Sequence, residues 1–83
     1  MNAATKTLVT RFFNECELTG AMLDVEVTPY VDSEAKKCGL SFPSKATYFF
    51  HDRINFNGVE EGIAFLANVN LIARMGRSQR RGL

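Results

Sequence analysis

The sequence predicts an α+β domain in which a small antiparallel sheet of two to four strands packs against one or two helices. Two apolar stripes with helical spacing, one towards each end of the chain, predict an N-terminal helix and a buried C-terminal helix. The residues between them alternate with period two or are rich in β-branched and aromatic types, as strands are. Because 83 residues bury only one core, we expect a single domain over residues 1–76, followed by a basic, flexible tail over residues 77–83.

The first helix is expected over residues 5–18. Its apolar side chains recur at spacings of one, three and four and form one stripe: Leu8, Val9, Phe12, Phe13 and Cys16. A strand over residues 8–13 is the alternative, because β-branched and aromatic residues are frequent there. Gly20 is expected to end the element, since glycine readily adopts the left-handed conformation found at helix ends.

The clearest strand is expected over residues 23–27, where apolar and acidic side chains alternate with period two. Pro29 lacks a backbone N–H donor, so pairing on at least one side is expected to stop near Thr28, at a strand end or a sheet edge. Residues 32–39 are then expected to form a helical turn or loop, which Gly39 ends.

Residues 45–56 are rich in strand formers and predict a hairpin or one bent strand, with alternation that resumes at residues 54–56. A short helix that starts at Pro43 or Ser44 is the alternative interpretation.

The C-terminal helix is expected to begin at Asn57, whose side chain can cap it while Glu60 completes a capping box. Its buried face is predicted from apolar residues at helical spacing, with Phe65 and Ile72 widening the arc: Val59, Ile63, Leu66, Val69 and Ala73. A strand over residues 69–75 is the alternative, because the same residues also show period-two features. Gly76 is expected to close the element.

Charge is distributed unevenly along the chain. The formal net charge is +1, but residues 1–61 carry all nine acidic residues, whereas residues 62–83 carry four arginines and no acidic residue. The two cysteines have no CxxC spacing and are expected to be free thiols in a reducing compartment, with a single bridge between them as the alternative. No apolar run approaches the ~20 residues that span a bilayer, and the N-terminus lacks signal-peptide features, so we expect a cytoplasmic protein without membrane contact.

No motif for catalysis, cofactor binding or metal binding is present in the sequence, and we expect neither enzyme activity nor a cofactor. His51 is the only histidine, and a half-exposed strand histidine is its simplest interpretation. Cys16 is expected in the core and Cys38 at the surface. A small enzyme or thiol sensor that uses Cys38 or His51 is the weakest of three functional hypotheses.

The chain is rich in large apolar side chains, with seven phenylalanines, two tyrosines and three methionines, so some are expected at the surface, where they serve protein interfaces. The candidates lie near turns, strand ends or the outer sheet face: Tyr30, Phe42, Tyr48 and Phe50. Asp24 and Glu26 share one strand face and predict either a solvated face or an acidic recognition surface. Other acidic residues would join that surface if the first helix and the turn lie beside the strand: Glu15, Glu17, Asp32 and Glu34.

The leading hypothesis is a non-enzymatic binding protein that occupies a surface of a larger protein or complex, such as a small inhibitor or adaptor of the kind carried by phages and mobile elements. The alternative is a nucleic-acid-binding or ribonucleoprotein-associated protein that uses an arginine-rich C-terminus. The arginines concerned are Arg74, Arg77, Arg80 and Arg81. A homodimer is compatible with either hypothesis, through edge pairing near Val25 or burial of exposed aromatic side chains.

Overall fold

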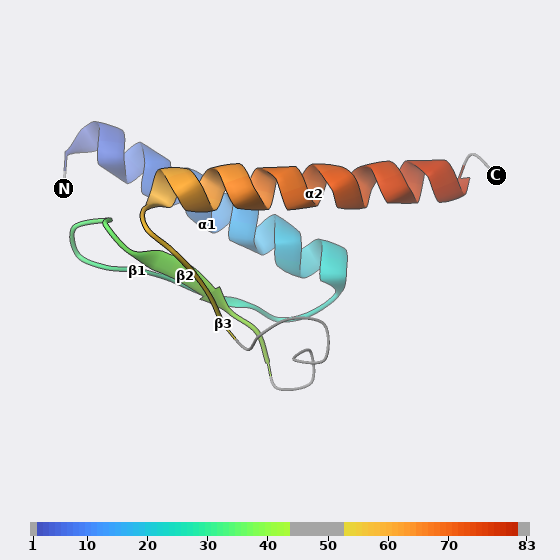
Figure 1. The fold of residues 1–83 in the computed structure, drawn as a ribbon, viewed down its shortest axis with the longest axis horizontal. Coiled ribbons are helices and arrows are strands. Elements are labelled where there is room, and N and C mark those ends of the chain that lie inside the picture. Colours follow the sequence, from blue (N-terminus) through green and yellow to red (C-terminus); the bar gives the residue numbers. More distant parts are fainter. Residues whose placement is uncertain (1, 44–52, 82–83) are drawn as a thin grey trace.

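The computed structural model describes residues 2–43 and 53–81, with side chains as far as residue 76. Within these ranges the chain forms α1 (Ala3–Leu23), β1 (Thr28–Val31), β2 (Cys38–Ser41), β3 (Arg53–Phe56) and α2 (Val59–Arg81). The strands form an antiparallel sheet in the order β1-β2-β3, and both helices lie on the same side of it (Figure 1). The predicted α+β class, with a helix towards each end of the chain, is confirmed.

Helix α1 is longer than the sequence predicts. It begins after Asn2, whose Oδ1 accepts a hydrogen bond from the Thr5 N–H at 2.8 Å. It ends at Asp24, which has a left-handed φ of 55° and donates its N–H to the Ala21 carbonyl at 3.3 Å. The prediction that Gly20 ends the helix is wrong, because Gly20 is buried inside it.

Gly20 serves close packing rather than termination. A Cβ atom at this position would lie 3.0 Å from both the carbonyl oxygen of Val25 and the side chain of Val27. The missing side chain therefore lets the connection after α1 fold back directly onto the helix. This close approach depends on residues that follow the helix, so it leaves no signal in the helical pattern itself.

Residues 24–27 are a connection and not the predicted strand, because Leu23 still belongs to α1 and the ladder of β1 starts at Thr28. The alternation of burial is nevertheless correct: Val25 and Val27 are half-buried, and Asp24 and Glu26 are exposed. Pro29 lies in β1, which is an edge strand, so the expected sheet edge is correct. The pairing that was expected to stop near Thr28 instead begins there.

The turn between β1 and β2 is shorter than expected. The Asp32 side chain accepts a hydrogen bond from the Lys36 N–H at 2.8 Å, and the Asp32 N–H donates to the Lys37 carbonyl at 2.9 Å. Cys38 and Gly39 already belong to the central strand β2, so Gly39 does not end this segment as predicted. Gly39 pairs with Tyr30, and a Cβ at residue 39 would collide with the Tyr30 ring.

Strand β3 confirms the strand that the sequence predicts at residues 54–56. The remainder of the predicted hairpin or bent strand, and the alternative helix start at Ser44, fall on residues 44–52 and lie outside the described residues.

Helix α2 begins at Val59, and the side chain that accepts the Asn57 N–H belongs to Glu61, at 2.7 Å, rather than to Glu60. The helix runs without interruption through Gly76 to Arg81, so the strand alternative and the expected end at Gly76 are both wrong. One glycine costs a helix only about 1 kcal/mol, which is too little to end it. The C-terminal part of α2, orange to red in Figure 1, projects beyond the end of α1.

The core lies between the helices and the inner face of the sheet. Its fully or nearly fully buried side chains come from every element except β1, and include Phe12 and Cys16 of α1, Cys38 and Leu40 of β2, Phe56 of β3, and Val59, Ile63 and Leu66 of α2. Gly62 lets α1 approach α2, because a Cβ there would lie 2.6 Å from the ring of Phe12. The two helices are therefore in close contact near Phe12.

A buried polar cluster fixes the rotation of α2 about its own axis. The Asn70 side chain is 1% exposed, and its Nδ2 donates to the Glu15 carbonyl at 3.2 Å and to Glu15 Oε2 at 2.8 Å. The Thr19 hydroxyl donates to Asn70 Oδ1 at 2.8 Å. Because a buried amide is costly unless its partners are in place, this cluster favours one orientation of α2 and decides which face points outward.

Candidate functional site

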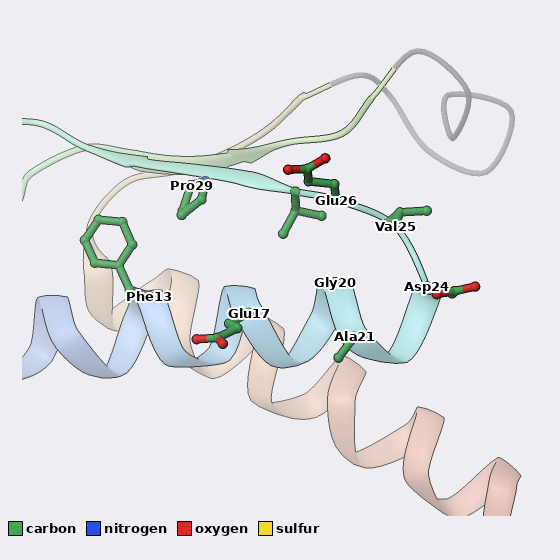
Figure 2. A pocket seen from close by; sticks show the side chains of 9 residues that line it. Phe13, Glu17, Gly20, Ala21, Asp24, Val25, Glu26 and Pro29 are labelled. Carbon is green, nitrogen blue, oxygen red and sulfur yellow. The ribbon is translucent and has the colours of Figure 1, made fainter.

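A groove lies between the C-terminal half of α1 and the chain that returns from it to the sheet (Figure 2). Its volume is about 600 Å³, within the range of natural binding pockets. The residues that line it define what we call the α1–β1 groove: Phe13, Glu17, Gly20, Ala21, Asp24, Val25, Glu26, Val27 and Pro29. Helix α1 supplies one wall, and residues 24–29 supply the other.

The residues that line the α1–β1 groove are mostly apolar, and three of them are acidic. Val25, Val27 and Pro29 are half-buried, and Phe13 is 38% exposed although it is a large apolar residue. Glu17, Asp24 and Glu26 are exposed, and the lining includes no basic residue. The groove therefore offers apolar contact and negative charge to a ligand.

The position of the acidic side chains follows from the end of α1. Asp24 occupies the left-handed residue that closes the helix, and the Val25 N–H donates to the Gly20 carbonyl at 3.0 Å. This turn reverses the chain within a few residues and places Glu26 on the wall opposite Glu17, with the side chains of Asp24 and Glu26 pointing away from α1 at the edge of the groove (Figure 2). The sequence predicted a surface shared by Asp24 and Glu26, which Glu17 would join if the first helix lay beside it, and all three residues line the groove.

The other acidic residues considered for this surface do not line the groove. Glu15 is bound to Asn70 in the interhelical cluster. Asp32 holds the turn between β1 and β2, and Glu34 in the same turn forms an ion pair with Lys36 at 2.9 Å.

The aromatic residues predicted to form a binding surface do not lie together, and none of those that the structure describes lines the groove. Tyr30 lies on the outer face of the sheet, where its hydroxyl is hydrogen-bonded to Asn55 and the Arg53 guanidinium lies 5.2 Å from its ring centroid. Phe42 is 7% exposed and belongs to the core, so its expected place at the surface is wrong. Tyr48 and Phe50 lie outside the described residues.

A second surface was missed by sequence reasoning. Four large apolar side chains on α2 are about half exposed, namely Phe65 at 48%, Leu71 at 54%, Ile72 at 60% and Met75 at 53%. We call them the outer face of α2. Helical spacing puts them on the side opposite the buried residues Ile63, Leu66 and Asn70. Ile72 therefore does not widen the core arc as expected, whereas the Phe65 ring does pack against the core residue Phe56, with ring centroids 5.4 Å apart. Two apolar stripes on one helix were the available signal.

The arginine cluster belongs to a helix and not only to the chain end. Arg74 is exposed on α2, and Arg77, Arg80 and Arg81 continue the same helix. The side chains of these last three lie outside the described part of the chain.

The positions of the two thiols argue against a catalytic or redox role for them. Cys16 and Cys38 are both free and both fully buried, so the expected surface position of Cys38 is wrong. Burial raises the pKa of the Cys16 thiol to about 12, with Cys38 and Glu15 acting in the same direction, and burial also raises the pKa of Cys38. A buried thiol that stays protonated is a poor nucleophile. His51 lies outside the described residues.

No group of three metal-ligating side chains occurs among residues 2–43 and 53–81. In the same residues neither helix is long and apolar enough to cross a membrane. Comparison with protein-family models, with curated proteins and with solved structures finds no match for this chain. The candidate binding surfaces of the described residues considered for function are the α1–β1 groove and the outer face of α2.

Proposed function

We propose that this domain is a non-enzymatic protein-binding module, such as a small inhibitor or adaptor, whose α1–β1 groove takes a segment of a larger protein. The observation that carries the proposal is the groove's combination of half-buried valines and a proline with three exposed carboxylates. Its occupant is a segment with an apolar anchor flanked by lysine or arginine. Such a segment buries apolar area against Val25 and Val27 and pairs with Glu17 and Glu26.

The position of the groove supports an extended ligand. Strand β1 is a sheet edge, and Pro29, which belongs to β1, also lines the groove. A segment that lies along this side reaches the apolar wall and the backbone of an edge strand together, which is how many domains recognise peptides. Two free, buried thiols suit a reducing compartment, and we propose the cytoplasm.

The test starts from a peptide library displayed on phage and selected against the purified domain. We expect the enriched peptides to carry basic residues on either side of an apolar residue. The affinity of a selected peptide is then measured by fluorescence anisotropy for the wild type and for Glu26→Lys. Reversal of this charge should weaken binding about tenfold, and raised salt should weaken it further.

Glu34→Lys is the matched control, because it makes the same change of charge at an exposed acidic residue that does not line the groove. Its affinity should stay within about twofold of the wild type. Equal losses for the two variants would mean that the peptide responds to overall charge and not to the groove. A selection that enriches no basic and apolar class would contradict the proposal.

The second candidate function is nucleic-acid binding by the basic end of α2. It is favoured by one observation, the continuation of the helix through Arg77, Arg80 and Arg81, which gathers four arginines on one projecting element. Anisotropy with labelled single-stranded RNA and duplex DNA tests it at two salt concentrations. Binding that is lost on deletion of residues 77–83, while peptide binding persists, would favour this candidate.

A further inference from the structure

We propose that the outer face of α2 is a homodimer seam, in which the α2 helices of two copies pack antiparallel. The proposal concerns a surface on a different element from the α1–β1 groove and does not depend on what the groove binds. It starts from the half-exposed side chains of the outer face, which a monomer would leave in water.

The spacing of these residues is that of a helix–helix seam. Phe65, Asn68, Ile72 and Met75 follow one another at intervals of three, four and three, which is the alternation of two core positions in a heptad repeat. All four are exposed, and Leu71 flanks the stripe. The buried cluster at Asn70 holds α2 so that this stripe points away from α1.

Charge selects a second copy as the occupant and selects the antiparallel direction. Residues 59–70 of α2 carry two glutamates and no basic residue, whereas residues 71–81 carry four arginines and no acidic residue. A parallel pair would place like charges together. An antiparallel pair brings the acidic half of each helix alongside the basic half of the other, and it also opposes the two helix dipoles. Helical spacing places the four arginine positions outside the seam itself, so this attraction acts along the helices and not through contacts within the seam.

The same arrangement defines a register. If the two-fold axis passes near residue 70, Phe65 of one copy lies opposite Met75 of the other, and Asn68 lies opposite Ile72. Both contacts occur twice, because the interface is symmetric. A polar Asn68 in an otherwise apolar seam costs some stability but disfavours shifted registers.

The small hydrophobic core of the domain also favours dimer formation, because a second copy would bury additional apolar surface. The C-terminal part of α2 projects beyond α1, so its apolar side chains have no cover within the described part of the same chain (Figure 1). Domains of this size commonly gain needed apolar burial by oligomerisation. In the dimer each projecting helix covers the other.

Sedimentation equilibrium tests the dimer. The wild type should show the mass of two chains at micromolar concentration. Ile72→Glu puts two buried charges into each dimer and should raise the dissociation constant at least about a hundredfold. Asn14→Glu, an exposed position on α1 that carries the same new charge, should leave the constant unchanged. Helical circular dichroism of both variants should match the wild type, because neither position is buried.

Disulfide trapping tests the direction. The variants Phe65→Cys and Met75→Cys are prepared separately and mixed before oxidation, and the native Cys16 and Cys38 are too buried to interfere. In an antiparallel pair equivalent cysteines are ~15 Å apart along the axis, so only the mixture should form a crosslinked dimer. Crosslinks within either single variant would overturn the antiparallel arrangement. A wild type that stays monomeric up to millimolar concentration, or a dimer unaffected by Ile72→Glu, would overturn the seam.

Discussion

The two faces of α2 carry similar residue types but differ in what covers them. The inner face packs on α1 and the sheet, with Leu66 at 1% and Asn70 at 1% exposure. The outer face presents Leu71 and Asn68 to solvent on the same helix. Leucine, asparagine and glycine each occur on α2 in one buried and one exposed position, so the helix contains its own matched controls. We infer that the inner face determines folding and that the outer face determines association.

The largest difference is expected for the two leucines. Leu66→Ala removes a fully buried side chain and leaves a cavity, which should lower the free energy of unfolding by about 2–5 kcal/mol. Leu71→Ala should change it by less than about 0.5 kcal/mol when the protein is dilute enough to be monomeric. Urea denaturation followed by circular dichroism measures both. Comparable losses would show that the outer face is buried within the monomer.

The two asparagines should differ next. Asn70→Ala leaves Thr19 and Glu15 without their interhelical partner, and the loss should be about 1–3 kcal/mol in the free energy of unfolding. Asn68→Ala removes an exposed amide and should be near neutral in the monomer. Differential scanning calorimetry would compare the two melting temperatures. A neutral Asn70→Ala would mean that the polar cluster does not hold α2 in its orientation.

The two glycines should respond with opposite signs. Gly62→Ala places a Cβ 2.6 Å from the Phe12 ring and should destabilise the fold by about 1–3 kcal/mol. Gly76→Ala meets nothing within 4 Å and should stabilise by up to about 1 kcal/mol, because alanine is the better helix former. Thermal denaturation measures both shifts. A destabilising Gly76→Ala would indicate that the helix is not formed at this position in solution.

The last effect is a dependence on pH that reports the core against which the inner face of α2 packs. The Cys16 pKa is raised from 9.0 in the unfolded reference to about 12 in the fold, so the unfolded state releases its proton first as pH rises. Stability should therefore be complete below pH 9 and fall above it by at most about 1.4 kcal/mol per pH unit for this thiol. Chemical denaturation between pH 8 and pH 10.5 measures the slope. If a Cys16→Ala variant shows the same slope of stability against pH, the Cys16 thiol is not the source of the pH dependence.

Sequence reasoning predicts the helices well because their signals are local. The stripe that contains Phe12 and Cys16 needs only helical spacing, and the structure buries both. Glycine misled the prediction three times for one reason. Gly20 and Gly39 are required for close contacts with other segments of the chain, and Gly76 lies in a helix that continues past it, whereas each was interpreted as a local stop.

The candidate site was predictable only in part. The acidic pair Asp24 and Glu26 was identified from alternation, and this alternation reports burial against α1 rather than pairing in a sheet. The sequence could not show that a left-handed Asp24 would turn the chain back beside Glu17. The outer face of α2 was missed because two stripes on opposite sides were taken as one wide apolar arc.

The claim that the inner face of α2 determines folding and the outer face determines association is tested most directly by amide NMR spectra of the wild type over a dilution series. We predict that the resonances of Phe65, Asn68, Ile72 and Met75 shift together with concentration, while those of Val25 and Val27 in the groove stay constant. Resonances of the outer face that do not change between micromolar and millimolar concentration, or shifts concentrated in the α1–β1 groove, would contradict the account.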